Sequence, residues 1–144
     1  MRVFAGMIVL TQIITTLTGC NKANKIYPTT ENLIEIESKR LKVLEAKDNE
    51  SGVFIRIGES HTRKCEIQIL GASIKNEISV NSIEHEDKIK AVCFWGNKAY
   101  SHTRSPFTNV ALRIDETVTL DIQAFNSENK EYLAFTLVNA PIGK

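Results

Sequence analysis

The sequence predicts an all-β fold, an antiparallel β-sandwich of about seven strands of immunoglobulin-like or transthyretin-like type, with room for one N-terminal helix. From residue 53 onward, apolar side chains recur at every second position, as on one face of an extended chain. Short polar stretches separate these runs, which is typical of turns between antiparallel strands. Cys65 and Cys93 both fall on the apolar faces of such runs, so a bridge between them would lie in the core.

Seven segments carry the alternation. They are residues 53–57, 65–69, 77–80, 88–95, 110–114, 118–124 and 133–137. Trp95 shares the apolar face of Cys93, which resembles the immunoglobulin pattern of a disulfide packed against a tryptophan. The likeness is one of architecture and carries no function with it.

The segment 31–47 fits two structures. Its leucine, glutamate and lysine content favours a helix, as does a rough helical stripe of Leu33, Ile36, Arg40, Leu41 and Leu44. Ile34 and Ile36 also alternate, as strand residues do, and residues 48–52 have the composition of a hairpin turn. We expect the helix, with the strand as the alternative.

The N-terminus has the layout of a secretory signal peptide. Arg2 precedes an uncharged, largely apolar run that ends at Leu17, and Thr18-Gly19-Cys20 follows. This run is too short and too polar for a membrane-spanning helix, which needs about 20 apolar residues. Leu17 to Cys20 resembles the lipobox of bacterial lipoproteins.

That resemblance implies cleavage after Gly19 and a lipid on the Cys20 thiol, and therefore an attachment to the membrane. We expect a signal peptide over 1–19, a tether over 20–30 and the β-sandwich domain over 31–144. Asn21 stands where an aspartate retains similar lipoproteins in the inner membrane. The expected location is the periplasmic face of the outer membrane.

Charge and cysteine content narrow the function classes. The 18 basic and 17 acidic residues give a formal net charge of +1, which does not indicate a nucleic-acid-binding surface. With Cys20 assigned to lipid, Cys65 and Cys93 remain as a pair in an oxidising compartment, where disulfides persist. We predict a Cys65–Cys93 disulfide, the alternative being two buried free thiols.

No sequence motif for catalysis or cofactor binding is present. His61, His85 and His102 fall in predicted turns, and Glu84 to Asp87 form the densest cluster of metal-ligand residue types. Neighbouring residues of one turn seldom converge on one ion, so we predict a solvated loop there, no metal and no cofactor.

The segment 96–107 lacks a clear strand pattern and is the predicted partner-binding loop. It carries Tyr100, His102, Arg104 and Phe107, and aromatic and arginine side chains dominate interface energies. The alternative is a polar connection with Tyr100 or Phe107 tucked onto the core. His61 and Arg63 form a weaker candidate surface.

The sequence therefore favours a non-enzymatic, lipid-anchored interaction module with a protein partner in the envelope. An inhibitor, immunity or exclusion lipoprotein is one alternative. A structural subunit of an envelope complex is another, because the layout of lipobox, tether and sandwich is similar to that of small lipoproteins of type VI secretion complexes. An envelope hydrolase that uses His85 or His102 is the competing class.

Overall fold

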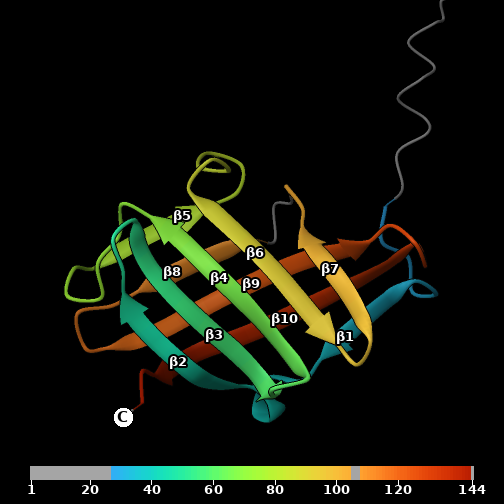
Figure 1. The fold of residues 1–144 in the computed structure, drawn as a ribbon, viewed down its shortest axis with the longest axis horizontal. Helices are drawn as coiled ribbons and strands as arrows, with labels where there is room; N and C mark the ends of the chain where they lie inside the picture. Colours follow the sequence, from blue (N-terminus) through green and yellow to red (C-terminus); the bar gives the residue numbers. More distant parts are fainter. Residues whose placement is uncertain (1–26, 105–107, 144) are drawn as a thin grey trace, which may run out of the picture.

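The computed structural model describes residues 27–104 and 108–143, which form one curled β-sheet (Figure 1). Its ten strands are β1 (Leu33–Ile36), β2 (Lys42–Asp48), β3 (Gly52–Ser60), β4 (Arg63–Leu70), β5 (Ile78–Asn81), β6 (Ile89–Trp95), β7 (Lys98–His102), β8 (Asn109–Leu112), β9 (Thr117–Asn126) and β10 (Glu131–Pro141). Within these residues the one helical turn is the 3-10 turn η2 (Ser38–Arg40). The all-β prediction is confirmed, and each of the seven predicted segments contributes a strand.

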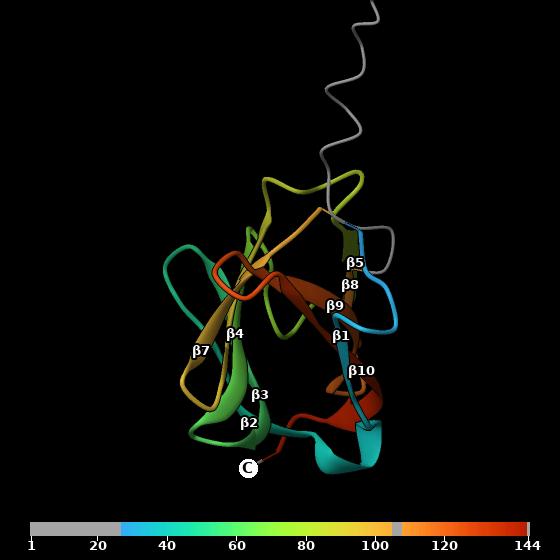
Figure 2. The ribbon, with the colours of Figure 1, turned by 90° about the vertical axis from the view of Figure 1, so that its right-hand side faces the viewer.

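The strands follow the order β1-β10-β9-β7-β6-β4-β3-β2, with β8 paired to β9 and β5 paired to β8. β9 is the point at which the sheet turns over. Its second half pairs with β7, where Phe125 lies opposite Ser101, and its first half pairs with β8, where Asp121 lies opposite Asn109. The two ends of the sheet therefore face each other as two layers (Figure 2).

One layer consists of β2, β3, β4, β6 and β7, and the other of β1, β5, β8, β9 and β10 (Figure 2). Because the hydrogen-bonded ladder runs without a break from β1 to β2, the finer prediction of an immunoglobulin-like or transthyretin-like sandwich is not confirmed.

The core lies between the layers and is built from the alternating apolar positions. The fully buried side chains come from both layers and include Ile55, Ile57, Ile67, Ile69, Ile89, Leu112, Leu120, Ile122 and Leu133. Trp95 of β6 meets Phe135 of β10 edge to face, with ring centroids 5.3 Å apart. Burying each large apolar side chain contributes about 1.5–3 kcal/mol, so this core supplies the main stabilisation.

The predicted disulfide is present. Cys65 and Cys93 lie directly opposite each other on β4 and β6, are bonded, and are both buried. The immunoglobulin disulfide joins two sheets, whereas this one joins neighbouring strands of one layer. It therefore braces the layer that contains β4 and β6 and leaves the other layer without a covalent link.

The expectation of a helix over 31–47 is wrong. Leu33–Ile36 is strand β1, parallel to β10, and Lys42–Asp48 is strand β2, antiparallel to β3. Helix propensities differ by less than about 1 kcal/mol per residue among ordinary residues. Ile36 and Leu41 are both buried, and their packing into the core outweighs that local preference.

The expectation that 96–107 is a continuous loop is also wrong for Lys98–His102, which is strand β7. Gly96 has φ 71°, a left-handed conformation that favours glycine, and with Asn97 it turns β6 into β7. A Gly-Asn pair between two strands is typical of a hairpin turn, so this turn could have been predicted from the sequence.

Candidate functional site

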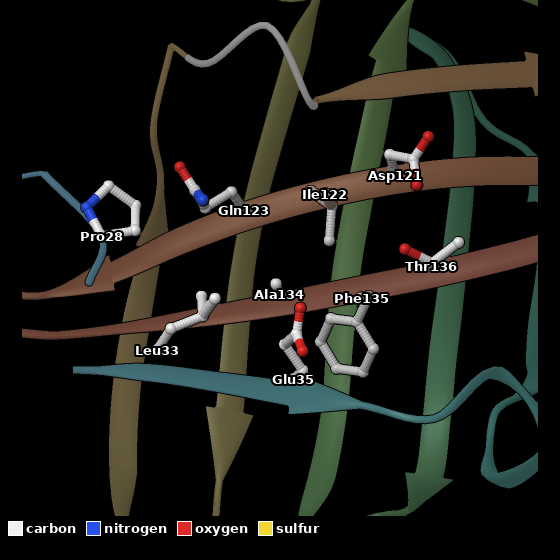
Figure 3. Close-up of a pocket in the computed structure, with 9 residues that line it drawn as sticks. All are labelled: Pro28, Leu33, Glu35, Asp121, Ile122, Gln123, Ala134, Phe135 and Thr136. Atoms are coloured by element: carbon white, nitrogen blue, oxygen red, sulfur yellow. The ribbon is translucent and has the colours of Figure 1, made fainter. Parts of the chain in front are cut away.

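A groove of about 350 Å³ lies on the outer face of β1, β10 and β9 (Figure 3). Alternate side chains of these strands face the core, and the others face outward into the groove. The lining residues come from the three strands and from the segment that precedes β1. They are Pro28, Leu33, Glu35, Asp121, Ile122, Gln123, Ala134, Phe135 and Thr136.

The hollow exists because a small residue occupies its centre. Ala134 of β10 lies opposite Glu35 on β1 and opposite Gln123 on β9, and its methyl group leaves the space between them unfilled. Figure 3 shows Leu33 and Glu35 along one side of β10, with Gln123 along the other. A larger residue at position 134 would fill the groove.

Aromatic residues mark one end of the groove, and a second hollow marks the other. The next outward-facing row holds Phe125 and Tyr132, whose ring centroids are 4.7 Å apart. Towards Thr136, a neighbouring hollow of about 360 Å³ is lined partly by Glu35 and Glu37. The outer face is therefore apolar at one end and acidic at the other.

The groove is flanked by two carboxylates that have no counter-ion among the described residues. Glu35 is on β1 and Asp121 is on β9, on opposite sides of β10 (Figure 3). Strands β1 and β9 are two strand spacings apart, about 10 Å. Neither carboxylate forms a salt bridge with any residue in 27–104 or 108–143. This part of the surface is left with negative charge.

Gln123 is the most buried polar residue of the groove, with 8% of its surface exposed. Its backbone is held on both sides: the amide donates to Oγ1 of Thr108 over 3.3 Å, and the carbonyl accepts from the amide of Thr103 over 3.2 Å. Its side-chain amide makes no hydrogen bond with another described residue. The backbone contacts hold Gln123 in place while its side chain keeps its hydrogen-bonding capacity.

The structure places Tyr100 in the core, with 1% exposed. Its hydroxyl donates to Oε1 of Glu131 over 3.3 Å, and the same oxygen accepts from Nζ of Lys98 over 2.8 Å. Burial, together with the charge of Glu131, raises the pKa of Tyr100 to about 12. In this conformation Tyr100 joins β7 to β10 and offers no surface to a partner.

His102 and Arg104 lie beside the loop that contains the predicted acidic cluster. Arg104 donates to the carbonyl of Ile83 over 3.0 Å and forms a 3.0 Å ion pair with Glu86. Burial lowers the pKa of His102, and the negative charge of Glu86 acts in the opposite direction. Nε2 of His102 and Nδ1 of His85 are buried and have no hydrogen-bond partner among the described residues. Sequence segments far apart therefore meet at this end of the molecule.

The other residues singled out from the sequence do not lie at the groove or lie outside the described residues. Cys20 and Phe107 lie outside the described residues. His61 is exposed in the β3–β4 turn, and Arg63 sits over the ring of Trp95, 5.6 Å from its centre. In the part of the chain that is described, no group of three histidine, cysteine, aspartate or glutamate side chains is arranged to hold a metal ion.

The sequence interpretation missed Glu35, Asp121 and Gln123 as site residues. Asp121 and Gln123 alternate with the apolar residues of β9, which predicted that they face away from the core. Nothing in that alternation predicted that β1 would lie beside β10 and add Glu35 to the same face. The groove depends on a pairing between distant segments.

Comparisons with protein-family models, with curated proteins and with solved structures find no match to this chain. None of the described residues belongs to a helix with the length and apolar character needed to span a membrane.

Proposed function

We propose that this chain is a lipid-anchored, non-catalytic binding protein of the bacterial envelope that holds a protein partner in the groove of β1, β10 and β9. The observation that carries the proposal is the groove itself, with apolar walls, two carboxylates without a counter-ion among the described residues, and a buried amide. Hollows with apolar walls and a few polar groups are typical sites for small ligands, and pockets in protein interfaces accept single anchoring side chains of a partner.

The anchor part of the proposal rests on Leu17 to Cys20 and on Asn21. A lipid at the periplasmic face of the outer membrane would hold the groove near a membrane-bound partner. Several acyl chains are needed for stable anchoring. Mass spectrometry of the N-terminal peptide should find acyl mass on Cys20, and Cys20→Ser should leave an uncleaved precursor. An unmodified N-terminus elsewhere would contradict the anchor.

The partner is sought with a photo-crosslinking amino acid at Thr136, an exposed position at the groove. The matched control position is Ser127, exposed in the β9–β10 turn. We expect a discrete crosslinked product from position 136 in the native host and none from 127. Equal yields would contradict the groove. An enzyme or toxin as partner would indicate an inhibitor or immunity protein, and an envelope component would indicate a structural subunit.

The proposal includes His102 and Arg104 in the partner surface, because Thr103 between them is hydrogen-bonded to Gln123 at the groove. Phe107 of the same segment belongs to the proposed surface from the sequence alone. Arg104→Ala should weaken partner binding by at least about 1 kcal/mol. Unchanged crosslinking from Thr136 in this variant would restrict the surface to the groove.

A further inference from the structure

We infer that the groove receives a lysine or arginine side chain from an exposed segment of the protein partner. The inference rests on the proposed function and names the chemistry that the groove would recognise. It is carried by three independent features of the outer face of β1, β10 and β9. These are two carboxylates with no ion pair among the described residues, a largely buried glutamine whose side-chain amide makes no hydrogen bond to another described residue, and apolar walls.

The charge of the groove is negative on both sides. Glu35 and Asp121 stand across β10 from each other, and neither has a cation within the described residues (Figure 3). Glu37 continues the acidic surface, and its ion pair with Lys39 spans 3.8 Å between exposed side chains. An ammonium or guanidinium group between Glu35 and Asp121 would be attracted by both carboxylates.

Gln123 points to a ligand independently of the charge. The residue is more than nine-tenths buried, lines the groove, and has a side-chain amide without a hydrogen bond to another described residue. Its amide nitrogen and oxygen do not belong to the buried polar atoms that lack a partner, so they are accessible and can hydrogen-bond to a ligand. The amide oxygen accepts hydrogen bonds, so it suits the N–H groups of lysine or arginine.

The apolar walls of the groove match the methylene groups of a lysine or arginine side chain. Pro28, Leu33 and Ala134 line the groove with apolar atoms. Lysine and arginine carry three or four methylene groups below the charged group, and these pack on apolar surface while the charge reaches polar partners. An anionic or wholly apolar ligand would leave either the walls or the carboxylates without complementary contacts.

The test uses the full chain in neutral detergent and four blocked pentapeptides. Their central residue is lysine, arginine, norleucine or glutamate, flanked by alanine and glycine. Binding is followed by the NMR shifts of the backbone amides of Glu35, Gln123 and Ala134. We expect the lysine and arginine peptides to bind at least tenfold more tightly than the norleucine peptide, which has a stem like that of lysine and no charge. Equal binding of norleucine would overturn the inference.

The matched variants separate local charge from overall charge. Glu35→Gln combined with Asp121→Asn should abolish the tenfold preference, whereas Glu50→Gln combined with Glu128→Gln, at exposed turn positions, should preserve it. An equal loss in both double variants would overturn the inference. If the first double variant does not fold, Glu35→Gln alone is used, because Glu35 is exposed. An undiminished preference of this variant for the lysine and arginine peptides would also overturn the inference.

Gln123→Leu tests the buried amide and should reduce the affinity for the lysine peptide several-fold while leaving norleucine binding unchanged. Failure of this inference can be distinguished from failure of the proposed function. If crosslinking from Thr136 is specific but the peptides show no preference for a cation, the groove binds its partner through its apolar walls. In that case the inference fails and the proposed function stands.

Discussion

The two layers carry charged residues on their outer faces, but they compensate these charges differently. On the face of β2, β3 and β4, Arg56 bonds to Glu45 and forms a 3.0 Å ion pair with Glu66. Lys64 reaches the same Glu66 carboxylate over 3.4 Å. On the face of β1, β10 and β9, Glu35 and Asp121 have no cation among the described residues. The charges named on the first face are paired within the chain, whereas the two on the second face have no ion pair among the described residues.

The apolar residues of the outer faces differ in the same way. Phe94 is exposed on β6 and has Nζ of Lys64 5.8 Å from its ring centre, and Phe54 lies under Lys47 and Arg56. Long cationic side chains thus lie close to both rings. On the opposite face the small Ala134 leaves a hollow, and no lysine or arginine of the described residues lines it. The face of β3, β4 and β6 also has a hollow, of about 260 Å³, but the carboxylate of Glu66 in its lining is already paired with Arg56 and Lys64. A cationic ligand would gain less there, which is why we place the binding site on the other face.

The largest test of the two-layer arrangement is Phe135→Ala. Phe135 is 2% exposed, packs against Trp95 of the opposite layer, and forms part of the groove floor. Its removal should lower the free energy of unfolding by about 3–5 kcal/mol. Urea denaturation measures the change. Phe94→Ala, on the paired outer face, is the control and should cost much less, and similar losses would show that the core is not concentrated between the layers.

The second-largest effect is expected from removing the disulfide, which is present in only one of the two layers. Cys65→Ala or Cys93→Ala should each lower the free energy of unfolding by about 2–5 kcal/mol, because the bridge restricts the unfolded chain. Urea denaturation under non-reducing conditions gives this value. In the wild-type protein from its native compartment, maleimide should label neither thiol under denaturing conditions until a reductant is added. Labelling without reductant would mean that the brace is absent in the cell.

The paired layer was largely predictable from the sequence, and the groove layer only in part. Residues 53–57 and 65–69 alternate strictly and are buried on one side, so their strand character followed from local pattern. Leu33–Ile36 is short and rich in residues that also suit helices, and it became a strand through its pairing with β10. Periodicity describes one strand at a time and contains no information about such a neighbour.

The same limit applies to site residues. Tyr100 has the composition of an interface anchor, but its place in β7 directs it into the core, where Glu131 from a distant strand accepts its hydrogen bond. The alternation in β9 predicted that Asp121 faces outward. Its importance depends on Ala134 and Glu35, which the register of β10 and β1 brings to the same face. The sequence shows which side chains are acidic, polar or apolar, but it does not show which of them the pairing of distant strands brings together.

Tyr100 links the two layers through a hydrogen bond whose effect depends on pH. Tyr100→Phe keeps the ring and should cost about 0.5–1.5 kcal/mol, the net contribution of one such bond. The folded pKa of about 12 lies above the ordinary value of 10, so the folded state retains the proton more strongly. This stabilisation is complete below pH 10 and is lost as the pH rises to about 12. Ultraviolet titration of tyrosinate in wild type and Tyr100→Phe identifies the late-titrating group, and an ordinary titration would refute the burial of the Tyr100 hydroxyl beside Glu131.

The smallest expected effect tests the charge comparison directly. Arg56→Met removes the cation between Glu45 and Glu66 and should lower stability, because two carboxylates then face each other without it. Glu35→Gln should change the free energy of unfolding by no more than about 0.5 kcal/mol, since that carboxylate has no ion pair to lose within the described residues. Added salt screens charges, so it should narrow the gap between Arg56→Met and wild type and leave Glu35→Gln unchanged. Urea denaturation at low and high salt measures both variants. A clear destabilisation by Glu35→Gln would mean that its charge supports the fold, and the two outer faces would then not differ in the way the groove requires.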